Sequence, residues 1–223
     1  ATNGEYASEA DAAVRTAESR SVLAALGVPA EQIYFLGYPD TGMPYEESFL
    51  RQLYDGCRVS ASRWGRTETW RPDGQDFHFM RSGCHSTYTA ASVLRDLSDV
   101  LALVNPDTVY VTAPGDCHGD HDALGRFTTQ AVAAMENPPA LYYYLIHADR
   151  TDIWPERDAE RFRLPPMAAD HPLLRCAAER RPLPDGFPPA EKYSLIQSYT
   201  SQDPAAYNGY LLAFAKNDEL VFR

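Results

Sequence analysis

Residues 108–121, with the sequence TVYVTAPGDCHGDH, decide the fold that we predict for this chain. Residues 108–112 are β-branched and aromatic, which is typical of a strand. A helix is predicted from about 121 to 135, since NPP at 137–139 ends it, and a second strand follows at 141–147. Strand, helix and strand in this order form the repeating unit of a parallel sheet.

The same alternation extends toward the N-terminus. Residues 8–26 and 89–104 carry apolar side chains near helical spacing and predict two helices. Between them, residues 32–37 (QIYFLG) predict a short buried strand. Residues 44–88 have little periodicity, so we expect a long, mostly irregular insertion there, with a short helix near residues 46–54 and with aromatic side chains that form the wall of a pocket.

After residue 147 the chain becomes rich in proline, and we predict two closing helices near residues 191–199 and 205–216. No internal repeat or low-complexity tract occurs. We therefore predict one α/β domain over residues 1–223. Its mainly parallel, Rossmann-like sheet is flanked by helices, and the irregular insertion follows the second visible helix–strand unit.

Composition excludes several classes of function. The chain carries 31 acidic and 20 basic side chains, a formal net charge of −11. A surface this acidic repels phosphate groups, so we expect no nucleic-acid partner. No apolar run approaches the ~20 residues of a membrane-spanning helix. Four cysteines without CxxC spacing leave two alternatives open: free thiols, or disulfides such as one between Cys57 and Cys84.

The polar residues that suggest chemistry follow two predicted strands. One loop contains residues 40–43 (DTGM), and the other contains residues 116–121 (DCHGDH). Ligands of parallel α/β sheets bind beyond the carboxyl ends of the strands, so both loops are expected to border one site. The spacing of His118 and His121 can direct two imidazoles into one cleft. The same residues can also be helix caps, and a catalytic zinc needs three protein ligands, so spacing alone leaves both interpretations open.

The sequence resembles the PIG-L or LmbE-like superfamily of zinc-dependent de-N-acetylases. Four segments carry the resemblance, in the same order as in that family: residues 15–18 (RTAE) with 24–28 (AALGV), 35–43 (FLGYPDTGM), 105–121 (NPDTVYVT to HGDH), and Lys192 with 199–202 (YTSQ). The resemblance implies hydrolysis of the N-acetyl group of an N-acetylglucosamine-type sugar or glycoconjugate, with release of acetate. It also implies a Zn²⁺ cofactor and a small-molecule or oligosaccharide substrate.

One family motif is absent from the 223 residues. The HPDDE-like loop, which in the family supplies a His and an Asp to zinc and a second Asp as general base, does not occur. Residues 2–5 (TNGE) resemble the end of the family's second strand. We therefore expect that the first strand–helix–strand unit and the remaining zinc ligands lie upstream of Ala1. These residues alone are then expected to bind zinc poorly and to be inactive.

The resemblance assigns a role to each matching residue. His121 is the expected metal ligand, and His118 the expected catalytic group that stabilises the oxyanion and protonates the leaving amine. Asp120 is expected to orient His118, although an aspartate is also a common helix cap. Arg15 and Asp40 are expected to bind substrate. The alternative for Arg15 is an exposed position on a helix, and the alternative for Asp40 is a structural role in a turn.

The remaining histidines, His78, His85, His147 and His171, are predicted to be structural, and Cys117 a passive thiol or half of a disulfide. Two other functions stay open. One is a metal-free, non-catalytic sugar-binding relative of the same fold. The other is an unrelated α/β enzyme, which is disfavoured because GxGxxG, GxxxxGK[ST] and GxSxG motifs are all absent. The acceptor sugar, the oligomeric state and the location of the protein are not predicted.

Overall fold

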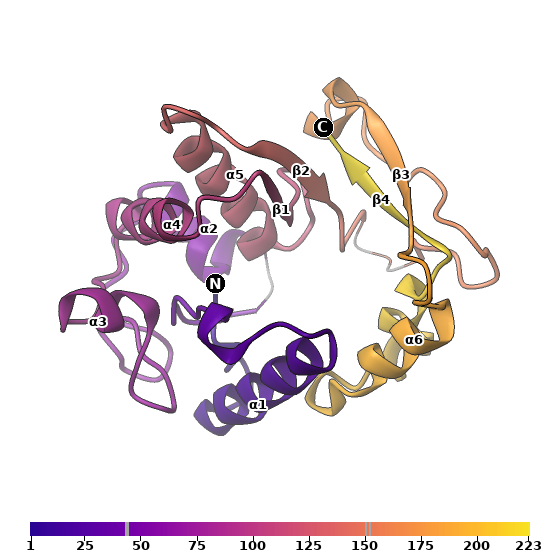
Figure 1. The fold of residues 1–223 in the computed structure, drawn as a ribbon. Helices are drawn as coiled ribbons and strands as arrows, with labels where there is room; N and C mark the ends of the chain where they lie inside the picture. Colours follow the sequence, from indigo (N-terminus) through magenta and orange to yellow (C-terminus); the bar gives the residue numbers. More distant parts are fainter. Residues whose placement is uncertain (43–44, 150, 152) are drawn as a thin grey trace.

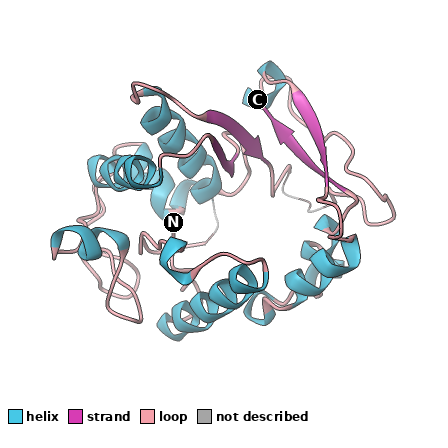
Figure 2. Ribbon diagram, viewed as in Figure 1, coloured by secondary structure: helices cyan, strands magenta, loops and turns pink. Residues whose placement is uncertain are grey.

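The structure, a computed structural model, describes residues 1–42, 45–149, 151 and 153–223. Its helices are α1 (Glu9–Ala25), α2 (Phe49–Tyr54), α3 (Phe77–Ser82), α4 (Ala90–Val104), α5 (Gly119–Ala133), α6 (Pro189–Gln197) and α7 (Ala206–Gly209). Its strands are β1 (Thr108–Thr112), β2 (Ala140–Tyr144), β3 (Ala178–Pro182) and β4 (Asp218–Phe222). Figures 1 and 2 show helices α2, α4 and α5 beside β1 and β2, with α1 and α6 across from them. Among the described helices, none is long and apolar enough to cross a membrane.

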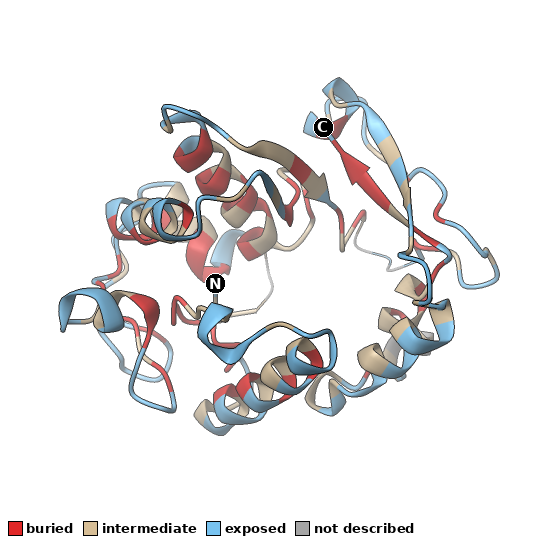
Figure 3. Ribbon diagram, viewed as in Figure 1, coloured by how far each residue is buried: buried red, intermediate tan, exposed pale blue. Residues whose placement is uncertain are grey.

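The sheet is mixed, and the predicted mainly parallel, Rossmann-like character is not confirmed. The strand order is β1-β2-β4-β3. Strands β1 and β2 are parallel, as the crossover through α5 requires, whereas β4 is antiparallel to both β2 and β3. Strands β3 and β4 were not predicted. The β4 sequence DELVF is nevertheless the more buried of the two (Figure 3), because it lies between β2 and β3.

The predicted strand at residues 32–37 does not form a ladder in the described part of the chain. Residues 30–32 form a short 3₁₀-helix instead, and one parallel bridge joins Thr2 to Tyr38. Two hydrogen bonds support this bridge, from Asn3 N to Tyr38 O at 2.8 Å and from Tyr38 N to Ala1 O at 3.2 Å. The run is buried only in part, because residues 33–35 are half-buried whereas Leu36, and Tyr38 after the run, belong to the main core cluster.

Residues 44–88 are not confirmed as an insertion, and the short helix expected near residues 46–54 is present there as a 3₁₀-helix (Tyr45–Glu47) followed by α2. They contain α2 and α3, and Phe49, Leu50, Leu53 and Phe77 are buried in the main core with Val93 of α4 and Phe127 of α5. Residue 44 lies outside the described residues. The segment therefore contributes to the core, and the wall of a pocket is not its main role. Cys57 and Cys84 are exposed and are not joined, so the Cys57–Cys84 disulfide is not formed, and Cys117 and Cys176 form no disulfide either.

Helices α4 and α5 cover one face of β1 and β2. The helix predicted at 89–104 is confirmed: Thr89 Oγ1 accepts a hydrogen bond from Ser92 N at 3.0 Å, and Asn105 ends the helix with a positive φ of 46°. Leu101 of α4 packs with Ala131 and Val132 of α5, and Val109 and Leu141 contact this cluster from the sheet. Helix α5 starts directly after the loop that follows β1. Its packing on β1 and β2 therefore places the first turn of α5 at the end of the sheet where β1 finishes.

Candidate active site

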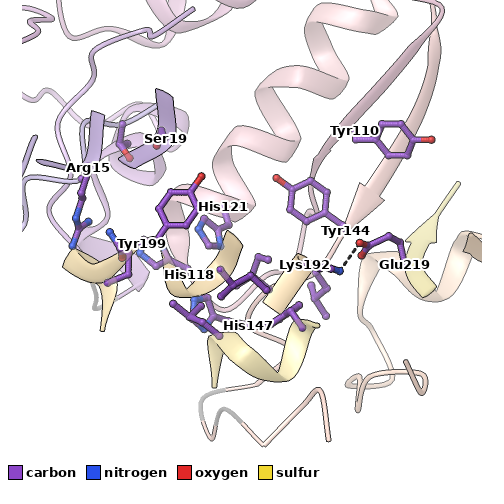
Figure 4. A pocket seen from close by; sticks show the side chains of 18 of the residues that line it. Arg15, Ser19, Tyr110, His118, His121, Tyr144, His147, Lys192, Tyr199 and Glu219 are labelled. Atoms are coloured by element: carbon purple, nitrogen blue, oxygen red, sulfur yellow. Dashed lines mark hydrogen bonds and ion pairs between the residues drawn. The ribbon is translucent and has the colours of Figure 1, made fainter. Parts of the chain in front are cut away.

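A cavity of about 840 Å³ lies at the carboxyl ends of β1 and β2. Four of the five residues that the sequence indicated for the site, Arg15, Asp40, His118 and His121, line it together with His147. The fifth, Asp120, lies beside them. Met43, at the end of the 40–43 loop, lies outside the described residues. Figure 4 shows the three histidines close together, with Tyr199 beside them and Arg15 further out on the same side.

Three imidazole rings form the polar centre of the cavity. The ring centroids of His118 and His121 are 4.5 Å apart with nearly parallel planes, and His147 lies 5.5 Å from His121 and 5.9 Å from His118. His147 also stacks on Tyr210 at 5.5 Å. His147 was predicted to be structural, but its side chain lies on the cavity wall and can also contact a ligand there.

Asp116 connects the two loops that carry these histidines, and sequence reasoning assigned it no role. Its carboxylate is buried and accepts hydrogen bonds from His118 N at 2.9 Å, Ile146 N at 2.9 Å and His147 N at 3.1 Å. His121 Nδ1 lies 3.3 Å from Asp116 Oδ1. Burial by itself raises the pKa of Asp116, but the neighbouring His121 and the backbone donors outweigh it and lower that pKa.

His118 is held as a neutral imidazole. It is the N-cap of α5, and its Nδ1 accepts a hydrogen bond from Asp120 N at 3.2 Å. Burial, and then the proximity of His121 and His147, lower the pKa of His118 to about 4. At neutral pH its proton is therefore on Nε2, since Nδ1 is an acceptor.

One carboxylate oxygen of Asp120 accepts a hydrogen bond, and the other has no hydrogen-bond partner among the described residues. Oδ1 accepts a hydrogen bond from Leu50 N at 2.7 Å, whereas Oδ2 is buried and has no hydrogen-bond partner among the described residues. Burial and the nearby Asp40 raise the pKa of Asp120 to about 7. Ligand atoms of Asp40, His118 and Asp120 all lie within 4.8 Å of one another, so these three side chains can approach a single cation.

Asp40 both shapes a turn and lines the cavity, so the two alternatives that the sequence left open for it hold together. Its Oδ1 accepts a hydrogen bond from Gly42 N at 2.7 Å, which shapes the turn. Its Oδ2 lies 3.7 Å from Arg15 Nη1, and its own backbone N donates to buried Glu5 at 3.2 Å. Arg15 is thus anchored beside the cavity rather than exposed on a helix surface.

Gly119 is required by close packing at the start of α5. A Cβ at this position would lie 2.2 Å from Tyr45 O and 2.7 Å from Ser48 Cβ, far inside van der Waals contact. The residue between His118 and Asp120 therefore has to lack a side chain in this chain, and this lets the helix start directly against residues 45–48.

Glu18 joins two segments that the family resemblance also singled out. Its carboxylate accepts hydrogen bonds from Thr200 Oγ1 at 2.9 Å, Ser201 N at 2.8 Å and Ser201 Oγ at 2.5 Å. Although burial raises the pKa of Glu18, the Ser201 and Thr200 donors lower it overall. The 199–202 segment is thereby held on α1, which places Tyr199 and Gln202 at the cavity.

Replacing Glu18 by alanine is expected to lower the free energy of unfolding by about 3 kcal/mol at pH 7, because three donors to a carboxylate lose their acceptor. Because the folded-state pKa is lowered, the wild-type contribution is present above the unfolded pKa and is lost as pH falls through the folded pKa. Denaturant unfolding of wild type and Glu18→Ala at pH 7 and pH 3 measures both effects. Equal stability of the two proteins at pH 7 would contradict this function of Glu18.

Several cavity residues have no signal in the sequence pattern. They include Tyr110 of β1, Tyr144 and His147 at and after the end of β2, and Glu219 of β4. From the predicted 44–88 insertion, Arg71 alone reaches the described lining, so the tryptophans of that segment do not form the wall. Asp116 could have been predicted from the sequence, since it precedes the His118–His121 pair by two residues.

Comparison with known proteins agrees with the resemblance. The family model PIG-L, described as GlcNAc-PI de-N-acetylase, matches residues 1–132 of the 223. The match therefore includes Arg15, Asp40 and the whole loop from Asp116 to His121. No curated protein and no solved structure matches the chain.

Proposed function

Because the chain belongs to the PIG-L family, we propose that it is a zinc-dependent hydrolase that removes the acetyl group from an N-acetylglucosamine-type sugar or glycoconjugate and releases acetate. The observation that carries this proposal is the meeting of His118, His121, Asp40 and Arg15 on one cavity, although they come from three distant segments. The family is described as a de-N-acetylase, which supports a hydrolase in general. The imidazole, carboxylate and guanidinium groups of these four residues are suited to the hydrolysis of an N-acetyl group.

The donor atoms at the histidine loop suit zinc, which prefers imidazole nitrogen and carboxylate oxygen. We assign His121 as a ligand, because the Asp116 carboxylate beside its Nδ1 favours a proton there and leaves the Nε2 lone pair available. In the family the other protein ligands are the His and Asp of an HPDDE-like loop, a motif that does not occur in the 223 residues. When bound, zinc lowers the pKa of a water and polarises a carbonyl group.

The residues of this chain perform the remaining steps. His118 Nε2–H donates a hydrogen bond to the amide carbonyl oxygen as negative charge builds on it. Because the lowered pKa leaves His118 neutral, the proton for the departing amine nitrogen is the one that the attacking water loses, in place of the proton expected from His118. Asp120 fixes the orientation of His118 through its backbone N–H, and its Oδ2 has no hydrogen-bond partner among the described residues. Arg15 and Asp40 offer a donor and an acceptor to the hydroxyl groups of the sugar.

The decisive test is metal analysis of the full-length protein by mass spectrometry, combined with acetate release from N-acetylglucosamine and its glycosides. We expect close to one zinc per chain and acetate release that a chelator abolishes and added zinc restores. Protein that is folded, binds sugar and contains no metal would instead be the non-catalytic relative. Protein with zinc that hydrolyses none of these amides would contradict the proposed reaction.

A further inference from the structure

Gly115 lies in the loop between β1 and α5, and side chains contact both of its peptide groups. Its N–H donates to Asp122 Oδ1 at 2.7 Å, and its carbonyl oxygen lies 3.1 Å from His171 Nε2. Asp122 belongs to the first turn of α5, whereas His171 comes from the segment between β2 and β3. One residue of the loop is therefore held from two separate parts of the chain.

The other ring nitrogen of His171 decides which group donates to the carbonyl oxygen. His171 is the N-cap of a short 3₁₀-helix, Pro172–Arg175, and its Nδ1 accepts a hydrogen bond from Leu173 N at 3.2 Å. An imidazole whose Nδ1 is an acceptor carries its proton on Nε2. His171 Nε2–H consequently donates to Gly115 O, and the orientation of the ring is set by its own segment.

The His171 ring also packs directly on the loop. Gly115 has a φ of 94°, in the left-handed region that residues with side chains rarely adopt. A Cβ at this position would lie 2.7 Å from His171 Nε2 and 3.0 Å from Pro172 Cδ, which is inside van der Waals contact. The imidazole thus occupies the space where a side chain of residue 115 would otherwise lie.

Asp122 holds the other peptide group and is itself held firmly. Its side chain is buried, and it accepts hydrogen bonds from Arg51 Nη1 at 2.6 Å and from Arg126 Nε at 2.9 Å, in addition to Gly115 N. Arg51 belongs to α2, so the carboxylate also joins two helices. Hydrogen bonds between charged groups are about twice as strong as those between neutral groups, so Gly115 N has a fixed acceptor.

Gly115 is followed directly by Asp116, which arranges the histidines. The Asp116 carboxylate accepts hydrogen bonds from backbone N–H groups of its own loop and of the segment after β2, and it lies 3.3 Å from His121 Nδ1. Because Gly115 and Asp116 share a peptide group, a shift of Gly115 moves the Asp116 backbone. The same shift moves the loop that leads to His118.

We propose that His171 is a positioning residue for the reaction: together with Asp122 it fixes the peptide groups of Gly115, and thereby the places of Asp116 and of the His118 ring. His171 is not in the cavity lining, so it acts through the loop and contacts no ligand of the cavity. The inference rests on the proposed function, because it concerns the ring that donates to the reacting amide.

Three substitutions of His171 in the full-length protein test the inference by kinetics. His171→Ala is expected to lower kcat for acetate release about 10-fold and to keep KM within about twofold, since residues that orient the groups of a metal site contribute about 10- to 100-fold. His171→Phe fills the same space without a donor and should lose as much. His171→Gln has an amide N–H near the position of Nε2 and should stay within about threefold of wild type.

Nuclear magnetic resonance of the ¹⁵N-labelled histidine rings gives a readout that needs no turnover. Wild-type protein should show His171 as the tautomer with its proton on Nε2. The ring signals of His118 and His121 should shift in His171→Ala and His171→Phe and return toward wild type in His171→Gln. The matched control is Leu174→Ala, which truncates a half-exposed side chain of the same 3₁₀-helix and should change neither the signals nor kcat.

The outcomes separate this inference from the proposed function. Wild-type kcat and unshifted His118 and His121 signals in a folded His171→Phe protein would overturn the inference, because packing alone would then suffice. An equal loss of kcat in Leu174→Ala would overturn it as well, since any disturbance of the segment would have the same effect. Wild-type protein that releases no acetate, with ring signals that still shift in His171→Phe and recover in His171→Gln, would contradict the proposed function and support the positioning of the loop by His171.

Discussion

Replacing His121 by alanine is expected to lower zinc affinity by more than about 100-fold and to abolish acetate release. Loss of a residue that only supports a ligand already costs about 10- to 100-fold, and loss of the ligand itself costs more. His121 starts its helix next to Asp116, whose carboxylate lies 3.3 Å from Nδ1, so the Nε2 lone pair of the wild-type residue is prepared for a cation. Competition with a chromophoric chelator gives the affinity directly.

The matched control for this variant is His85→Asn. His85 contacts Asp76 and lies outside the cavity lining, so its replacement should leave zinc affinity within about twofold. Thermal melts of both variants report whether the fold is kept. A folded His121→Ala protein that retains zinc would remove His121 from the ligand set. The metal would then be held by Asp40, His118 and Asp120, whose ligand atoms lie within 4.8 Å of one another.

Replacing His118 by alanine is expected to lower kcat about 10²- to 10³-fold while zinc binding and KM change little. The Nε2–H of this residue is proposed to act on the reacting amide, and its Nδ1 is already occupied by Asp120 N. An interaction made mainly in the transition state lowers kcat and kcat/KM together. Steady-state kinetics with acetate detection, together with a zinc measurement on the same sample, tests this expectation.

The two histidine variants are informative as a pair. We expect His121→Ala to lose metal and His118→Ala to keep it, although the two rings are only 4.5 Å apart. The reverse pattern would show that the Asp40, His118 and Asp120 group holds the metal and that the assigned roles are exchanged. Loss of zinc from both variants would mean that His118 is also a ligand, in conflict with its role as a hydrogen-bond donor through Nε2.

Much of the site was predictable because it is local in the sequence. The helix at 89–104, the strand at 108–112 and the polar loop that follows are determined by side-chain periodicity and by capping residues. The same loop brings His118 and His121 together within a single helical turn. The prediction that Arg15 and Asp40 would join them came from the family resemblance, and the cavity lining agrees with it.

The errors concern contacts between distant residues. Residues 44–88 have little periodicity, yet Phe49, Leu50 and Phe77 are buried, because short helices pack on α4 and α5 without needing a long amphipathic pattern. Strand β4 was not predicted, since its five residues carry no strong signal until β2 and β3 pair with them. The sheet is consequently mixed rather than mainly parallel.

The sequence by itself determined the family, the α/β class and the loop that carries the two histidines. Only the tertiary structure decided that Asp116 ties this loop to the segment after β2, that His147 joins the cavity, and that Tyr110 and Tyr144 open onto it. The physical reason is that capping and periodicity act over a few residues, whereas burial of a carboxylate or exposure of a ring depends on which distant strands and loops pack around it.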